Sequence, residues 1–174
     1  ENATATHSIS FVFANATVKE GGCLSMHEGV VSDYFKIDFL PDGVFKNPKD
    51  ARKWTLNVWF NINSTGSFKI MDYNLHILPT SVYNTTEEDF TKATASELDI
   101  EASGSDAFKC STSSLALSSD STIEFKNVQV LANARFDGDD FPQDQKYEVC
   151  LLDTKTSDIV PIVVGACLAA LVIV

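Results

Sequence analysis

Apolar and polar residues alternate along much of this chain. In the segment Trp54–Ile62 every second residue, beginning with Trp54, is apolar, and the opposite side carries Thr55, Asn57 and Asn61. This period of two predicts a strand with one buried face. Residues 63–67 are turn-forming and Phe68–Leu78 is apolar-rich again, so the two segments predict a hairpin.

The apolar phase changes inside the second strand of this hairpin. Phe68 and Ile70 share one phase, whereas the later apolar residues take the other: Met71, Tyr73, Leu75 and Ile77. One extra residue moves every following side chain to the opposite face, so a β-bulge near Ile70–Asp72 explains the change. An unbroken strand buried on both faces is the alternative.

Five more segments have this alternation and predict strands: His7–Phe13, Tyr34–Leu40, Ser114–Ser118, Ser121–Phe136 and Lys146–Leu152. Helical periodicity is rare. The best helix alternative is Glu87–Leu98, with Thr85 or Thr86 as its N-cap. The rest of Thr80–Asp106 is expected to be a surface connection. The chain is therefore expected to be all-β, with residues 1–152 forming one domain that is long enough to bury a core.

The last residues are apolar without interruption. Ile159–Val174 carries no charge and would rise about 24 Å as a helix, against a hydrocarbon core of about 30 Å. We expect a transmembrane helix that is cut short, after a juxtamembrane linker at residues 153–158; a buried core segment is the alternative. Within this run small residues recur at spacings of four, which places them on one helix face: Gly165 with Ala169, and Ala166 with Ala170. This face either packs on another membrane helix or reflects the ordinary composition of membrane helices.

Charge and glycosylation signals place the remainder in the secretory pathway. The net charge of −11 disfavours nucleic acid as a partner. Four Asn-X-Ser/Thr sequons predict N-linked glycans at Asn2, Asn15, Asn63 and Asn84. The chain starts like one from which a signal peptide has been removed. A glycosylated domain before a carboxyl-terminal anchor is a type I arrangement, with the lipid bilayer as a partner.

Cysteines and titratable residues offer little chemistry. Cys167 lies in the apolar run, so Cys23, Cys110 and Cys150 are left, which allow three pairings and leave one without a partner. The histidines, His7, His27 and His76, lie in no catalytic motif, and His76 is expected to be a satisfied side chain on a strand. The acidic residues at 137–140 are expected to form a solvated turn. We therefore expect a non-enzyme with no metal, no cofactor and no small-molecule substrate.

Four segments near the cysteines carry a family pattern. In Cys150–Val174, the most specific part, a cysteine and a short linker precede a Pro-Ile-x-Val-Gly run opening the span. Phe108–Ser111 has an aromatic-x-Cys pattern, Phe125–Phe136 is a predicted strand before the last cysteine of the domain, and Gly22–Leu24 contains the first. In these segments the chain resembles the membrane-proximal luminal domain of the lysosome-associated membrane glycoprotein family.

The resemblance implies a single β-prism-like or sandwich-like luminal domain in which Cys110 pairs with Cys150. It gives Cys23 no partner, because residues 39–53 contain no cysteine; Cys23 is then free, bonded to another chain or misaligned. The implied function is that of a glycocalyx and membrane organiser in the lysosomal or late-endosomal membrane, with the plasma membrane as the alternative location. A second hypothesis is an accessory or sorting subunit that binds a multi-pass membrane protein through its transmembrane helix.

Overall fold

The computed structural model describes residues 17–40, 53–79, 87–94, 100–118, 121–132, 134 and 141–154. This part of the chain is all-β, with helix only in the single turn formed by residues 151–154. Its strands are β1 (Thr17–His27), β2 (Val30–Phe39), β3 (Trp54–Ile62), β4 (Phe68–Ile77), β5 (Glu88–Thr91), β6 (Glu101–Ala102), β7 (Ala107–Ala116), β8 (Thr122–Val130) and β9 (Tyr147–Val149).

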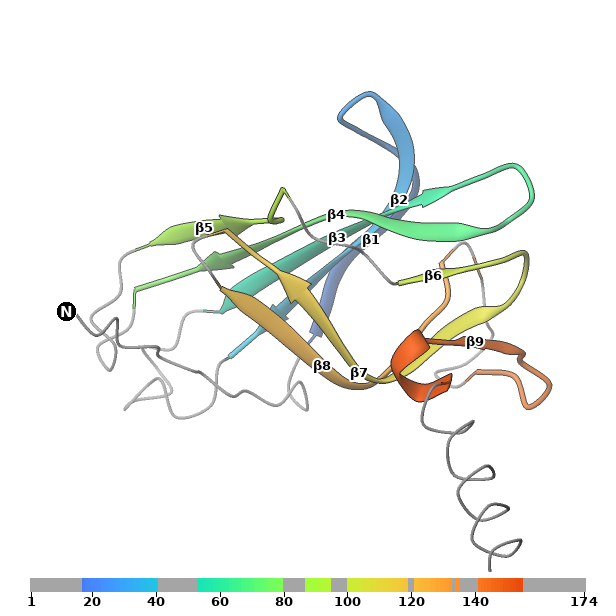
Figure 1. Cartoon of the computed structure of the whole chain (residues 1–174). Coiled ribbons are helices and arrows are strands. Elements are labelled where there is room, and N and C mark those ends of the chain that lie inside the picture. The colour runs from blue at the N-terminus through green and yellow to red at the C-terminus, as the bar shows by residue number, and fades with distance from the viewer. Residues whose placement is uncertain are drawn as a thin grey trace, which may run out of the picture.

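The strands form two sheets (Figure 1). The larger sheet has the order β1-β2-β3-β4-β5 and is antiparallel throughout. Both β5 and β6 pair with the edge of β4 that faces away from β3, β5 near the end of β4 and β6 near its start. The smaller sheet has the order β8-β7-β9, in which β7 and β9 run parallel. Parallel neighbours need a long crossover, and here the chain passes through β8 before it returns as β9.

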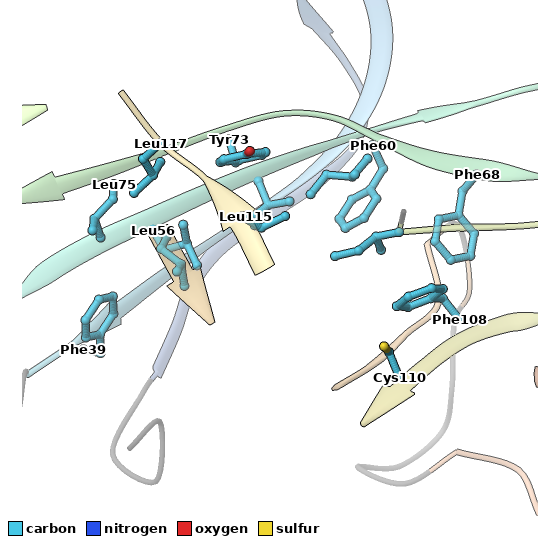
Figure 2. Packing of buried hydrophobic residues seen from close by; sticks show 14 of the residues in the cluster. Phe39, Leu56, Phe60, Phe68, Tyr73, Leu75, Phe108, Cys110, Leu115 and Leu117 are labelled. Carbon is cyan, nitrogen blue, oxygen red and sulfur yellow. The ribbon is translucent and has the colours of Figure 1, made fainter. Parts of the chain in front are cut away.

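Strand β3 has the predicted alternation. Its buried residues are Trp54, Leu56, Val58 and Phe60, and the residues between them are half-buried. The apolar set faces the second sheet and joins one continuous core cluster with Phe108, Leu115, Leu117 and Ile123 (Figure 2). The core therefore lies between the two sheets, as one-sided strands require.

The predicted bulge is confirmed in β4. Phe60 pairs with Ile70, while the preceding Trp59 pairs with Asp72, so Met71 is the extra residue. The bulge returns Tyr73 to the buried face on which Ile70 lies, and the residues that follow keep this phase. Both apolar phases of the segment therefore meet in one core.

The helix alternative for Glu87–Leu98 is wrong where the structure describes this segment. Residues 88–91 form strand β5, and Phe90 lies opposite Leu75 of β4, against the core. The expectation of a surface connection is also wrong near residue 100, because Ile100 is buried and β6 follows it. Both segments are held in place by long-range pairing with β4, and no periodic pattern in their own sequences predicts that pairing.

Other predicted strands have different limits. β2 begins at Val30 and β7 at Ala107, both earlier than expected, and β8 ends at Val130, earlier than expected. The segment Lys146–Leu152 is extended only as β9, because Leu151–Thr154 turns back as helix, with the Thr154 N–H donating to the Cys150 carbonyl at 3.2 Å. His7–Phe13 lies outside the described residues.

The described part of the chain contains no helix that is long and apolar enough to cross a membrane. The expected span, residues 159–174, lies outside it, as does the acidic segment at 137–140.

Candidate functional site

A disulfide closes the carboxyl end of the described domain. Cys110 in β7 and Cys150 directly after β9 are bonded, with their Cα atoms 5.3 Å apart. The parallel pairing of β7 with β9 places them, since Lys109 lies opposite Val149 and its carbonyl accepts the Cys150 N–H at 3.1 Å. Both cysteines are buried in the core. This is the pairing that the family resemblance implies.

The helical turn after Cys150 is fastened to β7 by Asp153. The Ser111 backbone N–H donates to Asp153 Oδ2 at 2.7 Å, and the Ser111 hydroxyl donates to Oδ1. These bonds favour the ionised carboxylate and hold the pKa of Asp153 below its ordinary value. Leu151 and Leu152, in the same turn, are exposed. The last described turn is therefore braced against β7 and carries two exposed leucines.

Asn63 lies at the exposed tip of the β3–β4 hairpin. Its Oδ1 accepts hydrogen bonds from the Thr65 N–H at 3.0 Å, the Thr65 hydroxyl at 2.7 Å and the Ser67 N–H at 3.0 Å. Gly66 completes the turn with φ of 85°, which glycine adopts without strain. All three bonds go to the side-chain oxygen, so the turn orders the sequon and none of them uses the amide nitrogen, the atom to which an N-linked glycan would be attached.

Cys23 lies on β1, and its thiol is exposed and in no disulfide within the described chain. Strand β1 is irregular here, because its register with β2 shifts between Gly22 and Ser25 and Leu24 has φ of 56°. The Leu24 N–H donates to Asp33 Oδ1 at 2.9 Å, and the other oxygen of this buried carboxylate has no hydrogen-bond partner among the described residues.

The tip of the β1–β2 hairpin exposes apolar side chains. Leu24 is 78% exposed and Met26 is 68% exposed, and Val30 and Val31 on β2 are exposed as well. We call these four residues the hairpin patch. Figure 1 shows the hairpin that carries these residues rising out of the larger sheet as a curved ribbon.

Two histidines pair with carboxylates, which the sequence did not indicate. His27 Nε2 lies 2.7 Å from Asp72 Oδ2, and the imidazole stacks on the Trp59 indole with ring centroids 4.1 Å apart. His76 Nδ1 lies 2.8 Å from Asp89 Oδ1, as expected for a satisfied strand histidine. His76 and Asp89 are cross-strand partners in β4 and β5, whereas His27 reaches Asp72 from β1, which does not pair with β4. Both contacts depend on the sheet order and register.

An open groove of about 680 Å³ follows β4 and β6. Its charged side chains are engaged locally: Lys69 Nζ lies 2.9 Å from Glu101 Oε2, and Glu148 Oε1 accepts the Ser103 N–H at 2.8 Å. Among the described residues that line the groove there is no histidine or cysteine.

Seven expected site residues lie outside the described part of the chain. They are the glycan acceptors Asn2, Asn15 and Asn84 and the helix-packing residues Gly165, Ala166, Ala169 and Ala170.

Comparison with known proteins gives no match: protein-family models, curated proteins and solved structures were each searched without one. Function is therefore inferred from this chain's own residues.

Proposed function

We propose that this protein is a non-catalytic type I glycoprotein of the lysosomal or late-endosomal membrane. Its β-prism-like luminal domain serves as part of a protective glycocalyx and organises the membrane to which it is anchored. The lipid bilayer is its main partner, and no nucleic acid, small-molecule substrate or cofactor is required.

The braced carboxyl end of the domain is the observation that carries this proposal. The Cys110–Cys150 disulfide and the Ser111–Asp153 bonds fix the turn at 151–154, and only residues 155–158 separate it from the apolar run at 159–174. A short connection of this kind would hold the domain close to a bilayer. The exposed Leu151 and Leu152 favour such a position, because they would contact the apolar side of the interface.

Protection follows from three properties of the domain. Disulfides persist in oxidising compartments, which fits Cys110–Cys150. Proteases need an extended backbone segment that they can pair with, and the described chain is mostly strand that is already paired within two sheets. A glycan on Asn63 would cover the hairpin tip between β3 and β4, which is an exposed turn of the kind that proteases attack.

The test is made on the full protein in cells. We expect it to colocalise with a lysosomal membrane marker, to stay in the membrane fraction after alkaline carbonate extraction, and to lose mass on enzymatic removal of N-glycans. Variants without Asn2, Asn15, Asn63 and Asn84 glycans should be degraded faster by lysosomal proteases at acid pH. Release by carbonate would reject the anchor, and unchanged degradation would reject the protective role.

A second candidate is an accessory or sorting subunit of a multi-pass channel, transporter or proton pump. The hairpin patch favours it, because Leu24 and Met26 are largely exposed and a partner could cover them. The expected packing face at Gly165 would hold the same partner inside the membrane. Copurification in mild detergent should then give one stoichiometric membrane protein, lost in Gly165→Leu or in Leu24→Ser with Met26→Ser. A monodisperse protein without a partner would reject this candidate.

A further inference from the structure

We propose that His27, Glu28 and Asp72 form a binding site for a divalent transition-metal ion of the zinc type. The site lies at the tip of the β1–β2 hairpin and is independent of the membrane-glycoprotein function proposed above. The ligand atoms are the imidazole Nε2 of His27 and one carboxylate oxygen from each acid.

The donor atoms already converge on one point. One potential ligand atom from each of the three side chains lies within 4.8 Å of the other two. His27 Nε2 and Asp72 Oδ2 are the closest pair at 2.7 Å, and their side chains are only about a quarter exposed or less. Glu28 is exposed, so solvent reaches the site from its side.

The hairpin turn holds His27 and Glu28 in place. His27 pairs with Val30 across the turn, and the two loop residues Glu28 and Gly29 have φ of 49° and 82°. Positive φ at both loop positions is the type I′ geometry that matches the twist of a tight hairpin. The irregularities in β1 bend this hairpin, and the His27 ring comes to lie flat on Trp59 of β3, with 13° between the ring planes. The stack restricts the direction in which Nε2 points.

The bulge at Met71 supplies the third ligand. It sets Asp72 opposite Trp59, on the face of the larger sheet that carries the His27 ring. The Tyr73 N–H donates to Asp72 Oδ1 at 2.8 Å, which orients the carboxylate and leaves Oδ2 toward His27. A backbone bond that orients a metal-binding carboxylate is a common outer-shell arrangement.

One imidazole with two carboxylates suits zinc better than calcium or magnesium, which prefer oxygen ligands alone. At Zn–N and Zn–O distances of about 2.1 Å, a tetrahedral site separates two ligand atoms by about 3.4 Å. The 2.7 Å pair must therefore open by about 0.7 Å, which small side-chain rotations supply. Neutral His27 has one ring hydrogen, which lies on Nε2 when Nε2 donates to Asp72. Metal binding uses the other tautomer: Nε2 gives its hydrogen to solvent, Nδ1 takes one from solvent, and the free lone pair of Nε2 binds the metal. Water fills the fourth position.

His76 provides an internal comparison. It also lies between two carboxylates, but these approach opposite ring nitrogens: Asp89 is 2.8 Å from Nδ1 and Glu87 is 3.7 Å from Nε2. A single ion cannot bind both acids and one nitrogen there. The His76 cluster therefore has a composition similar to the proposed site without its convergence, which makes it the matched control.

The experiment titrates Zn²⁺ into the full protein, purified in mild detergent and stripped with a chelator, by isothermal calorimetry. We expect one saturable equivalent per chain in the parent and in His76→Ala. His27→Ala and Asp72→Asn should each lower the affinity by about 100-fold or more, which exceeds the usual effect of an outer-shell change. Glu28→Gln alters an exposed turn residue, and we expect it to weaken binding by about tenfold or more.

A second readout does not depend on calorimetry. Cu²⁺ quenches nearby indoles, so quenching of the parent should exceed that of Trp59→Phe, and it should be weaker in Glu28→Gln than in the parent at the same sub-saturating Cu²⁺ concentration. Circular dichroism of each metal-free variant shows whether it is folded. If His27→Ala and Asp72→Asn do not fold, the affinity of Glu28→Gln for Zn²⁺ tests the site. No saturable Zn²⁺ binding, or affinity that is unchanged in Glu28→Gln or lost equally in His76→Ala, would mean that His27 and Asp72 form only a hydrogen-bonded pair.

Discussion

Tyr73 donates a hydrogen bond of 2.6 Å from its hydroxyl to the backbone carbonyl of Ala116. The donor lies in β4 of the larger sheet and the acceptor in β7 of the smaller one, and Tyr73 is fully buried. The contact is therefore a polar link between the two sheets inside the core, where an unmade hydrogen bond would be costly.

Replacing Tyr73 with Phe should lower the free energy of unfolding by about 1 to 2 kcal/mol, because the hydrogen bond is lost while the ring remains. Tyr34→Phe is the control. The Tyr34 hydroxyl bonds to Glu20 on an exposed face, a contact that raises the pKa of Tyr34, and its removal should leave stability unchanged. Urea unfolding measures both variants. Equal effects would contradict the role of Tyr73 as an inter-sheet link.

Deletion of Met71 should prevent native folding. Without the extra residue, Tyr73, Leu75 and Ile77 could not share the buried face with Phe68 and Ile70. Losing even a few buried large side chains costs about 2 to 5 kcal/mol each, which together exceeds the stability of an ordinary domain. Near-UV circular dichroism reports the packing. Met71→Ala, which keeps the residue count, should fold, and a native spectrum from the deletion variant would refute the bulge.

The bulge was predictable because its cause is local. Two apolar phases within one segment cannot both face a single core unless one residue is added, so the alternation around Ile70 and Met71 carries the information. Strand β3 was predictable for a similar reason, since its burial follows its own sequence.

Other features depend on contacts that no local pattern contains. Strand β1 includes Gly21 and Gly22 and two register shifts, so no period of two survives in it. Strand β5 forms because Phe90 pairs with Leu75 of β4. Likewise, His27 contacts Asp72, which lies 45 positions further along the chain. Such pairs require the sheet order, which a single sequence does not specify.

Replacing both Cys110 and Cys150 with Ala should destabilise the domain by about 3 to 4 kcal/mol, from the loss of a loop closure 40 residues long. Cys23→Ser is the matched control, because that thiol is exposed and its removal should change stability little. Thermal unfolding with and without a reductant measures both. If reductant lowered the melting temperature of the double variant as much as that of the parent, the stabilising disulfide would be elsewhere.

Asp153→Asn should make the carboxyl end less stable at neutral pH, since an amide cannot match the two bonds that Ser111 donates to the carboxylate. The pKa of Asp153 is lowered in the folded state, so its contribution is complete above the ordinary carboxyl pKa of about 3.9 and is lost as the pH falls through the lower folded value. The difference in melting temperature between parent and variant should therefore persist at about pH 5 and vanish only in stronger acid. Asp144→Asn, at an exposed position, should show no difference. A difference that already disappears at about pH 5 would contradict the assignment.

Thr65 should control whether Asn63 carries a glycan. Its hydroxyl and N–H both bond to Asn63 Oδ1, and the sequon requires a hydroxyl at this position. In protein expressed through a glycosylating secretory pathway, Thr65→Ala should therefore remove one glycan, seen as a single downward mass step that enzymatic deglycosylation abolishes. Thr65→Ser keeps the hydroxyl and should keep the glycan. Because Asn63 itself is intact in both variants, a difference between them reports the hydroxyl and not the loss of the acceptor. Equal masses for the two variants would show that Asn63 is not modified, and the hairpin tip between β3 and β4 would then be left open to proteases.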